Sequence, residues 1–244
     1  MHHHNIDRVE GTTIRKAAFR IILNTYNSVV QTAYMKEYIC FNYYINKDKV
    51  LIAPHPLNPV EITNDLQYDC VGLSNTNDDK IIEKLIQEEE EYSVLKTKGM
   101  HIVLKSKKYE YDNGFLKVIK GYIKDDEYND FIKKAKTIFM PFPLSFRNRM
   151  SGTLIDALTN KKTVISTNIP LIEACSKSYP NIVKIYNPNT FVDDVQKLGL
   201  KDVLKDLEYE KFAQEHSDNL LAKLLSDGIH NMILGEKITD RADF

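Results

Sequence analysis

The sequence predicts an α/β protein built on a doubly wound, mostly parallel sheet. Short apolar runs alternate regularly with longer stretches whose apolar residues recur at helical spacing, from residue 66 almost to the end of the chain. A strand that is followed by a helix and then by another strand pairs in parallel through a right-handed crossover. The 244 residues, 43% of them hydrophobic, suffice for one large domain or for one domain with a fragment of a second.

Two helices and two strands are expected in the first 60 residues. They are a helix at Thr12–Leu23, a strand at Ser28–Thr32, a helix at Met35–Tyr44 and a strand at Lys49–Pro56. Pro54, Pro56 and Pro59, with the acidic Glu61, then predict a hinge. We therefore place a domain boundary after residue 60 and assign residues 61–205 to a Rossmann-like domain.

The alternation from Leu66 onwards predicts the strands of that domain. They are expected at Asp69–Leu73, Met100–Lys105, Phe115–Ile119, Thr137–Pro141, Thr163–Ser166 and Ile182–Ile185. A helix begins at Asp78, and its acidic run Glu88–Glu91 is expected to form a solvated face. Residues 206–244 are assigned to terminal helices. Within them Glu208–Leu234 has a helical pattern, and we expect His216 to lie at the surface or in a cap.

The stretch 137–173 carries the strongest candidate site. A buried strand is followed by a polar loop and by a helix that opens at Ser151-Gly152-Thr153. Ser151 can cap this helix, and Gly152 lets a ligand approach the backbone. The N–H groups and the positive dipole end at a helix start suit a phosphate. About one turn later Asp156 interrupts the apolar residues, and its carboxylate can accept two hydroxyls of a ribose.

This stretch resembles the donor-sugar site of GT-B glycosyltransferases, in particular the large retaining group called glycosyltransferase group 1 or family 4. Their signature is a Glu, seven residues, a second Glu, then Ala and a strand introduced by Gly-x-Pro-Val. Asp156 stands at the second Glu and is followed by Ala157, whereas Asn148 stands at the first Glu. The resemblance therefore implies that Asn148 lies where family members place a charge against the donor sugar or its phosphates. Lys161 and Thr163 replace the Gly and the Pro of the signature.

The resemblance also implies where the phosphates would be held. After Gly72 the chain lacks the Arg and Lys with which the family grips the diphosphate, so either Ser74, Asn75 and Thr76 supply neutral hydrogen bonds or the site is weakened. Lysines follow the next strand, where family members often carry a cation. The alignment does not choose among Lys105, Lys107 and Lys108, and we take Lys105 and Lys107 as the candidates because strand alternation places them on one face. A surface role is the alternative.

Contacts with the base and with the sugar are implied in the same way. Tyr122 and Ile123 follow Gly121 where the family contacts the nucleotide base; the alternative is that they only plug the strand end. His4-Asn5 resembles the His-Asn or His-Asp beside the reacting sugar carbon, which would make His4 a catalytic residue. The other reading of the initial histidines is a cloning remnant. If His4 is native, residues 1–60 are the truncated end of the acceptor-side domain, and the terminal helices cross back onto it.

The resemblance implies a retaining transferase that moves a sugar from a UDP- or GDP-linked donor to a glycan or a lipid-linked acceptor. It implies no metal and no further cofactor, because amides and lysines neutralise the diphosphate. A noncatalytic nucleotide- or partner-binding remnant is the alternative, and an epimerase on the same fold is a third hypothesis. Polysaccharide or glycolipid synthesis is the expected setting.

Composition limits the partners. A net charge of −1, from 33 basic and 34 acidic residues, gives no reason to expect a nucleic-acid partner. The three cysteines lie far apart without metal-binding spacing, which fits a reducing cytoplasm. No apolar run approaches the ~18 residues of a membrane span. Peripheral membrane contact stays open, and a homodimer is expected because a truncated cleft would expose apolar surface.

Overall fold

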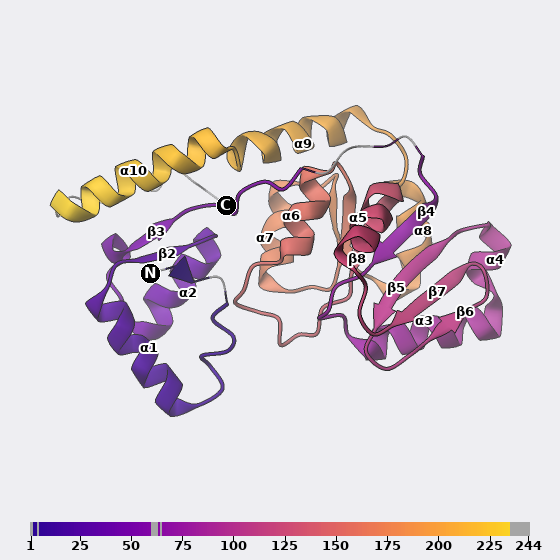
Figure 1. Cartoon of the computed structure of the whole chain (residues 1–244), viewed down its shortest axis with the longest axis horizontal. Helices are drawn as coiled ribbons and strands as arrows, with labels where there is room; N and C mark the ends of the chain where they lie inside the picture. Colours follow the sequence, from indigo (N-terminus) through magenta and orange to yellow (C-terminus); the bar gives the residue numbers. More distant parts are fainter. Residues whose placement is uncertain (1, 4, 60–62, 64, 235–244) are drawn as a thin grey trace. The chain divides into compact units, whose positions relative to one another are not determined.

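The computed structural model of the chain describes residues 2–3, 5–59, 63 and 65–234 (Figure 1). Contacts between residues divide the chain into two compact units. The first consists of Met1–Leu57, Ser145–Ser151 and Glu210–Phe244, and the second of Asn58–Leu144 and Gly152–Tyr209. The chain therefore leaves the second unit for seven residues directly before the helix that begins at Gly152, a division that the sequence did not indicate.

The first unit is built on a three-stranded parallel sheet with the strand order β1-β2-β3. Its elements in chain order are β1 (His2–His3), α1 (Thr13–Thr25), β2 (Ser28–Val30), α2 (Ala33–Tyr43), the short 3₁₀ helix η1 (Lys47–Lys49) and β3 (Val50–Ile52). The side chains of Thr12 and Thr32 accept backbone N–H groups and so cap α1 and α2. Leu23, Val30 and Ile39 lie in the buried core between helices and sheet. Strand β3 is shorter than the predicted strand Lys49–Pro56.

Two later segments complete the first unit. Asn5 forms an isolated antiparallel bridge with Arg149, and Asp7 accepts the backbone N–H of Asn148 at 2.7 Å. Helix α10 (Asp218–Leu234) contacts β3. Gly228 permits this contact, because a Cβ there would lie 2.4 Å from a methyl carbon of Leu51.

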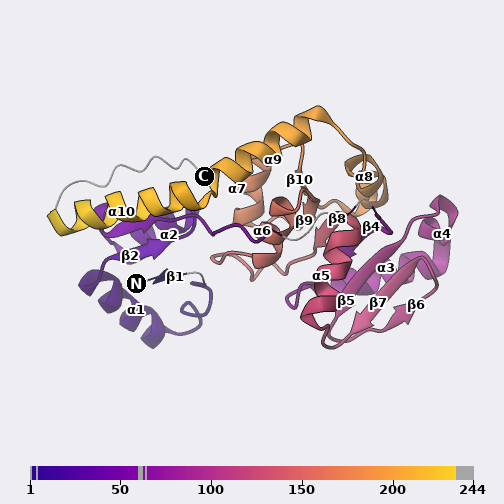
Figure 2. The same ribbon diagram turned by 45° about the horizontal axis from the view of Figure 1, so that its top comes forward.

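The second unit contains a seven-stranded sheet with the order β10-β9-β8-β4-β5-β7-β6 (Figure 2). The strands are β4 (Tyr68–Gly72), β5 (Ile102–Ser106), β6 (Tyr111–Asp112), β7 (Leu116–Lys120), β8 (Ala135–Met140), β9 (Thr163–Ser166) and β10 (Val183–Ile185). All neighbours pair in parallel except β6, which is antiparallel to β7. The predicted α/β class and the mostly parallel, doubly wound sheet are confirmed; the short edge strand β6 was not predicted.

Helices cover both faces of this sheet. They are α3 (Asp79–Tyr92), α4 (Val94–Lys98), α5 (Asp125–Lys134), α6 (Gly152–Thr159), α7 (Pro170–Ser178), the short 3₁₀ helix η2 (Pro188–Thr190), α8 (Phe191–Leu198) and α9 (Val203–Glu215). The connection through α3 runs in the opposite direction along the sheet from those through α5, α6 and α7. Right-handed crossovers therefore place α3 on the face opposite to these three helices (Figure 1). One buried cluster joins α3, α8 and the sheet, and it includes Ile82 of α3, Phe139 of β8 and Phe191 of α8.

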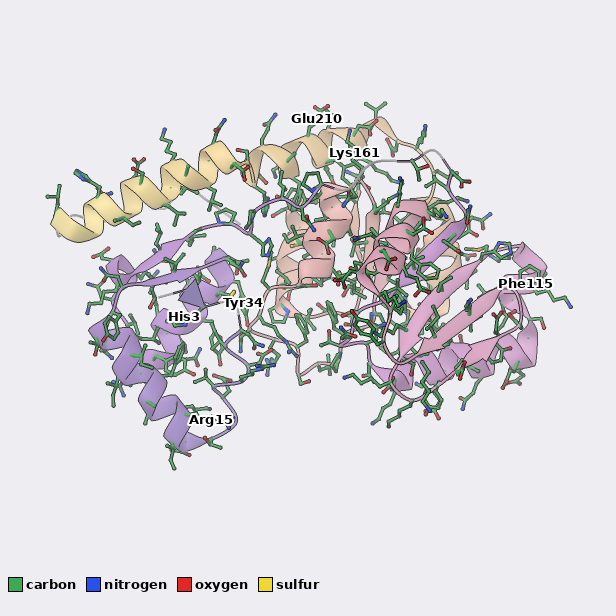
Figure 3. All side chains as sticks on the ribbon, in the orientation of Figure 1. His3, Arg15, Tyr34, Phe115, Lys161 and Glu210 are labelled. Atoms are coloured by element: carbon green, nitrogen blue, oxygen red, sulfur yellow. The ribbon has the colours of Figure 1, made fainter. Side chains whose placement is uncertain are left out.

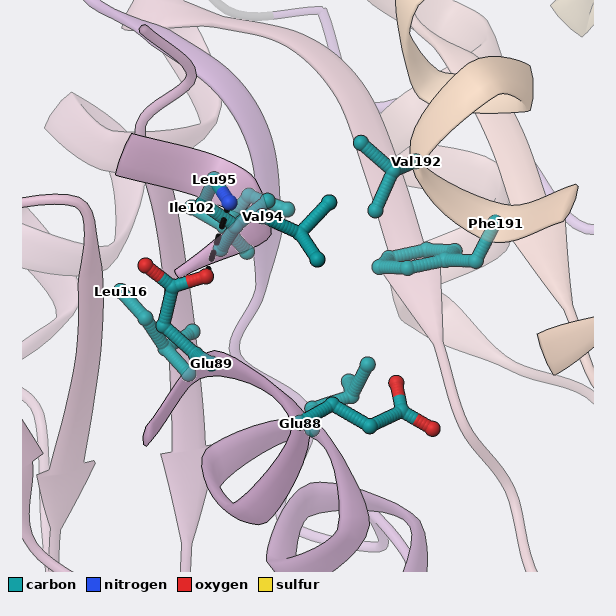
Figure 4. A pocket seen from close by; sticks show the side chains of 9 residues that line it. Glu88, Glu89, Val94, Leu95, Ile102, Leu116, Phe191 and Val192 are labelled. Atoms are coloured by element: carbon teal, nitrogen blue, oxygen red, sulfur yellow. Dashed lines mark hydrogen bonds between the residues drawn. The ribbon is translucent and has the colours of Figure 1, made fainter. Parts of the chain in front are cut away.

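The expected solvated face at Glu88–Glu91 is wrong for Glu89, which is 3% exposed. Helix α3 ends at Ser93 in a left-handed conformation, and α4 begins immediately afterwards. The carboxylate of Glu89 accepts the N–H of Leu95 at 2.7 Å (Figure 4). It also accepts the side-chain amide of Asn113 at 3.2 Å. The run of four acidic residues did not indicate that Glu89 is buried. Its burial depends on the tight turn at Ser93, which brings the first N–H groups of α4 to the Glu89 carboxylate.

A break divides the expected helix Glu208–Leu234 into α9 and α10. His216 lies at this break and is 7% exposed, so a surface position is wrong and a capping position is correct. Its Nδ1 is 3.0 Å from the carbonyl oxygen of Phe212, and the two rings stack with centroids 4.1 Å apart. Burial lowers the pKa of His216 to about 4.

Candidate functional site

A pocket of about 370 Å³ opens in the second unit, where the loops after β4, β5 and β7 meet the starts of α5 and α6. Ligands of doubly wound sheets bind at the carboxyl ends of the strands, which is where this pocket lies. The pocket is lined by Leu73, Ser74, Asn75, Thr76, Lys105, Tyr122, Ile123, Asp125, Tyr128, Gly152, Thr153 and Asp156. Its polar groups come from four segments of the chain that only the folded sheet brings together.

Lys105 is the cation of this pocket. It is 6% exposed at the carboxyl end of β5, and its Nζ donates to Oδ1 of Asn75 and lies 5.9 Å from the ring centroid of Tyr122. Burial lowers its pKa. No carboxylate is paired with Lys105 among the residues that the structure describes. A buried ammonium without a counter-ion is costly, and an anionic ligand would lower that cost.

The start of α6 provides a second group suited to an anion. Gly152 and Thr153 are its first residues and both line the pocket. The first N–H groups of a helix have no partner within the helix, and the dipole makes this end positive. A Cβ added at Gly152 would meet no atom within 4 Å, so the space beside this backbone is open. Lys105 and the start of α6 therefore give one part of the pocket a positive character, although Asp125 and Asp156 also line it.

Asp156 places a carboxylate in the same pocket, about one turn into α6. Its Oδ1 accepts a hydrogen bond of 3.1 Å from Nδ2 of Asn58. The hydroxyl of Tyr128 hydrogen-bonds to Asp156 and to Thr153, and burial is the main cause that raises the pKa of Tyr128 to about 12. The carboxylate is thus oriented by two neighbours while it still faces the pocket.

The structure brings together nine of the residues singled out in the sequence: Ser74, Asn75, Thr76, Lys105, Tyr122, Ile123, Gly152, Thr153 and Asp156. Lys107 does not line the pocket and is exposed. Strand β5 ends at Ser106, and Asp79 accepts both the Ser106 hydroxyl at 2.6 Å and the Lys107 N–H at 3.0 Å. The chain therefore turns before strand alternation can place Lys107 beside Lys105.

Asn148 and Ser151 belong to the first unit and do not line the pocket. Asn148 is 3% exposed, and its Oδ1 accepts a 2.7 Å hydrogen bond from the hydroxyl of Tyr34, which is labelled in Figure 3. The side chain expected against the donor sugar instead packs within the first unit. Spacing along the chain does not reveal that 145–151 leaves the second unit, and the contact of Asn148 with a donor sugar stays a prediction. His4 lies outside the described residues.

Two residues that hydrogen-bond to Asp156 were not singled out beforehand: Tyr128, which lines the pocket, and Asn58, which does not. Tyr128 lies within the amphipathic pattern of α5, where nothing distinguishes it from a packing residue. Asn58 follows the proline-rich hinge and has no periodic neighbours. Neither carries a local sequence signal for a site, because the partner of both is Asp156, about 30 and 100 positions further along the chain.

The described residues contain no cluster of His, Cys, Asp and Glu side chains arranged to hold a metal ion. Within the same part of the chain, none of the helices combines the length and the apolar character needed to cross a membrane. Cys40, Cys70 and Cys175 form no disulfide with one another, and Cys40 and Cys70 are buried.

No family model matches the sequence, and no curated protein resembles it in sequence. Solved structures do share its fold. A structure of S. aureus TarM in complex with Fondaparinux, alpha-GlcNAc-glycerol and UDP is 16% identical with a TM-score of 0.60, over 93% of this chain and 48% of that one. A glycosyltransferase from Rickettsia africae ESF-5 is 16% identical with a TM-score of 0.61, over 91% and 68%. The pneumococcal O-GlcNAc transferase GtfA, in complex with UDP and GlcNAc, is 10% identical with a TM-score of 0.52, over 84% and 45%.

The likeness to these solved structures shows the fold. The seven-stranded sheet with helices on both faces matches the Rossmann-like domain of the GT-B fold. At 10–16% identity the likeness establishes the fold and not the reaction. The chain spans about half the length of the TarM and GtfA structures.

Proposed function

We propose that this chain binds a nucleotide sugar and transfers the sugar, with retention of configuration, to a glycan or lipid-linked acceptor. The observation that carries the proposal is Lys105, a buried lysine that has no carboxylate partner among the described residues and shares its pocket with the first residues of α6. A diphosphate fits both groups. The structural neighbours that were solved with UDP bound share this fold, which supports a nucleotide-linked donor.

Each pocket group has a role in the proposed reaction. The N–H groups at Gly152 and Thr153 hold the diphosphate together with Lys105, and Asp156 accepts the ribose hydroxyls. As the bond between the anomeric carbon and the phosphate oxygen breaks, negative charge grows on that oxygen, and these groups stabilise it. The acceptor oxygen forms the new bond on the same face of the sugar, and its proton passes to the leaving phosphate.

The proposal includes further roles for residues at or near this pocket. Tyr122 and Ile123 line the pocket and would contact the base; Tyr122 is 76% exposed and offers an aromatic face, whereas Ile123 is 5% exposed. His4, if native, would lie beside the sugar as the catalytic residue. Cytoplasmic glycan synthesis is the setting that we propose for this chemistry, with UDP or GDP as the leaving nucleotide.

A noncatalytic nucleotide-binding protein on the same fold is the second candidate. The burial of Asn148 against Tyr34 favours it, because a polar residue expected at the donor sugar is used for packing. Such a protein would bind the nucleotide through Lys105 and Asp156 without turning over a sugar.

Calorimetric titration with UDP, GDP and ADP, followed by hydrolysis assays with the matching nucleotide sugars, separates these candidates. Saturable binding with slow release of free sugar supports the transferase, since many transferases also pass the sugar to water. Saturable binding without turnover supports the noncatalytic protein. Binding that is unchanged in Asp156→Ala contradicts the ribose role, and absence of binding to all three nucleotides contradicts both candidates.

A further inference from the structure

Tyr128 holds the carboxylate that the pocket offers to a ligand. Its hydroxyl hydrogen-bonds to Asp156, and the hydroxyl of Thr153 hydrogen-bonds to the same phenol. Asn58, from the segment before β4, donates to Oδ1 of Asp156 at 3.1 Å. The carboxylate is therefore held by side chains from two segments that are distant from it in sequence.

Asp156 lines the pocket while Tyr128 and Asn58 hydrogen-bond to its carboxylate. An ionised carboxylate can accept about four hydrogen bonds, and the two hydroxyls of a vicinal diol are donors of the kind that it accepts. The terminal torsion of an aspartate is broad, so a carboxylate without neighbours would rotate among several orientations. Because Tyr128 keeps its proton at neutral pH, its hydroxyl remains a hydrogen-bond donor there.

We propose that Tyr128 is a positioning residue that orients the Asp156 carboxylate and so makes the pocket prefer a ribonucleotide to its 2′-deoxy counterpart. The inference rests on the proposed function, because it takes Asp156 as the ribose contact. The 2′ and 3′ hydroxyls of a ribose donate to the carboxylate that Tyr128 holds. A 2′-deoxyribose lacks one of these donors, so the oriented carboxylate loses a hydrogen bond to the ligand.

The test compares ribonucleotide and deoxyribonucleotide affinities. UDP, GDP and ADP are titrated into the full chain by calorimetry, and the tightest binder is compared with its 2′-deoxy form. The wild-type chain is expected to prefer the ribonucleotide by about tenfold. Tyr128→Phe keeps the ring but removes the hydroxyl. It should weaken the affinity for the ribonucleotide by about fivefold and change the affinity for the 2′-deoxy form little. The preference should therefore fall.

A matched control comes from the same unit. Tyr109 also hydrogen-bonds to a carboxylate, that of Glu83, but it does not line the pocket. Tyr109→Phe should leave both affinities unchanged. Asn58→Ala removes the other hydrogen bond to Asp156 and should lower the same preference, which provides a second route to the result if Tyr128→Phe folds poorly.

A double-mutant cycle separates positioning from general packing. In the Asp156→Ala background, Tyr128→Phe should have no further effect on ribonucleotide affinity, because the group that it orients is gone. An equal loss for the ribo and deoxy forms, or the full fivefold loss in that background, overturns the positioning role and leaves the proposed function intact. A wild-type chain that binds none of the three nucleotides overturns both.

Discussion

The hydroxyl of Tyr34 donates a 2.7 Å hydrogen bond to Oδ1 of Asn148, which lies 114 positions further along the chain. This contact ties the segment 145–151 to helix α2 of the first unit. Asp7 strengthens the connection by accepting the backbone N–H groups of Arg147 at 3.0 Å and of Asn148 at 2.7 Å. A short excursion of the chain is thus fixed by polar contacts immediately before the helix that lines the pocket.

Asn148→Ala should destabilise the first unit by about 1–2 kcal/mol, because it leaves the Tyr34 hydroxyl without this acceptor. Thermal or denaturant unfolding followed by circular dichroism measures the change, with the exposed Asn219→Ala as the control. Unchanged stability together with weakened nucleotide binding would contradict the packing role and restore the contact with the donor that the sequence implied.

Lys105→Met should weaken the binding of a nucleoside diphosphate by about tenfold or more, since it removes a charge-assisted contact to phosphate. The affinity for the corresponding nucleoside without phosphates should change little. Calorimetry with both ligands measures the difference. Lys120→Met, at an exposed position at the end of β7, should alter neither value. Similar losses for the nucleoside and the diphosphate would argue that Lys105 acts on the fold of the pocket.

Gly152→Ala should keep the fold and impair binding. Its added Cβ meets nothing in the protein, and alanine favours the helix more than glycine does, so stability should hold or rise by up to about 1 kcal/mol. The methyl group would occupy the open space through which a phosphate approaches the backbone. Calorimetry should show weaker diphosphate binding, whereas Gly11→Ala, also with open space around it, should bind normally. Unimpaired binding would show that the phosphate lies elsewhere.

Glu89→Ala should lower the free energy of unfolding of the second unit by about 1–3 kcal/mol, because the buried N–H of Leu95 loses its acceptor. The exposed neighbour Glu90→Ala provides the control, with an expected change within about 0.5 kcal/mol. Chemical denaturation monitored by circular dichroism compares the two variants. Equal effects would mean that the buried carboxylate contributes nothing beyond its charge.

Acidification should destabilise the first unit through His216. Its pKa is about 4 in the folded chain against 6.5 for the ordinary group, so the folded state binds fewer protons between these values. The contribution of neutral His216 to the free energy of unfolding is complete above about pH 6.5 and is lost as the pH falls toward 4. Its upper limit is roughly 3 kcal/mol. His216→Phe should flatten stability against pH over this range, whereas His230→Phe, at an exposed position, should not. An unaltered slope in His216→Phe would assign the dependence to other groups.

Regular periodicity made most of the second unit predictable. Strand β9 occupies Thr163–Ser166 as expected, and the other predicted strands of that unit lie within about two residues of their expected bounds. The helix start at Gly152 and the aspartate one turn later were also indicated locally, because a polar loop and a small residue between two apolar runs mark such a turn. Long-range pairing decided the antiparallel edge strand β6 and the burial of Glu89.

The sequence by itself determined the class of sheet and which local groups suit an anion, because both follow from the spacing of residues within short segments. Only the tertiary structure decided which groups meet. In the structure Lys105 lines the pocket, whereas Lys107 does not. Asn148 accepts a hydrogen bond from Tyr34. Tyr128 and Asn58 hydrogen-bond to Asp156. These outcomes depend on contacts between distant segments, which compete for the same polar groups in ways that periodicity does not record.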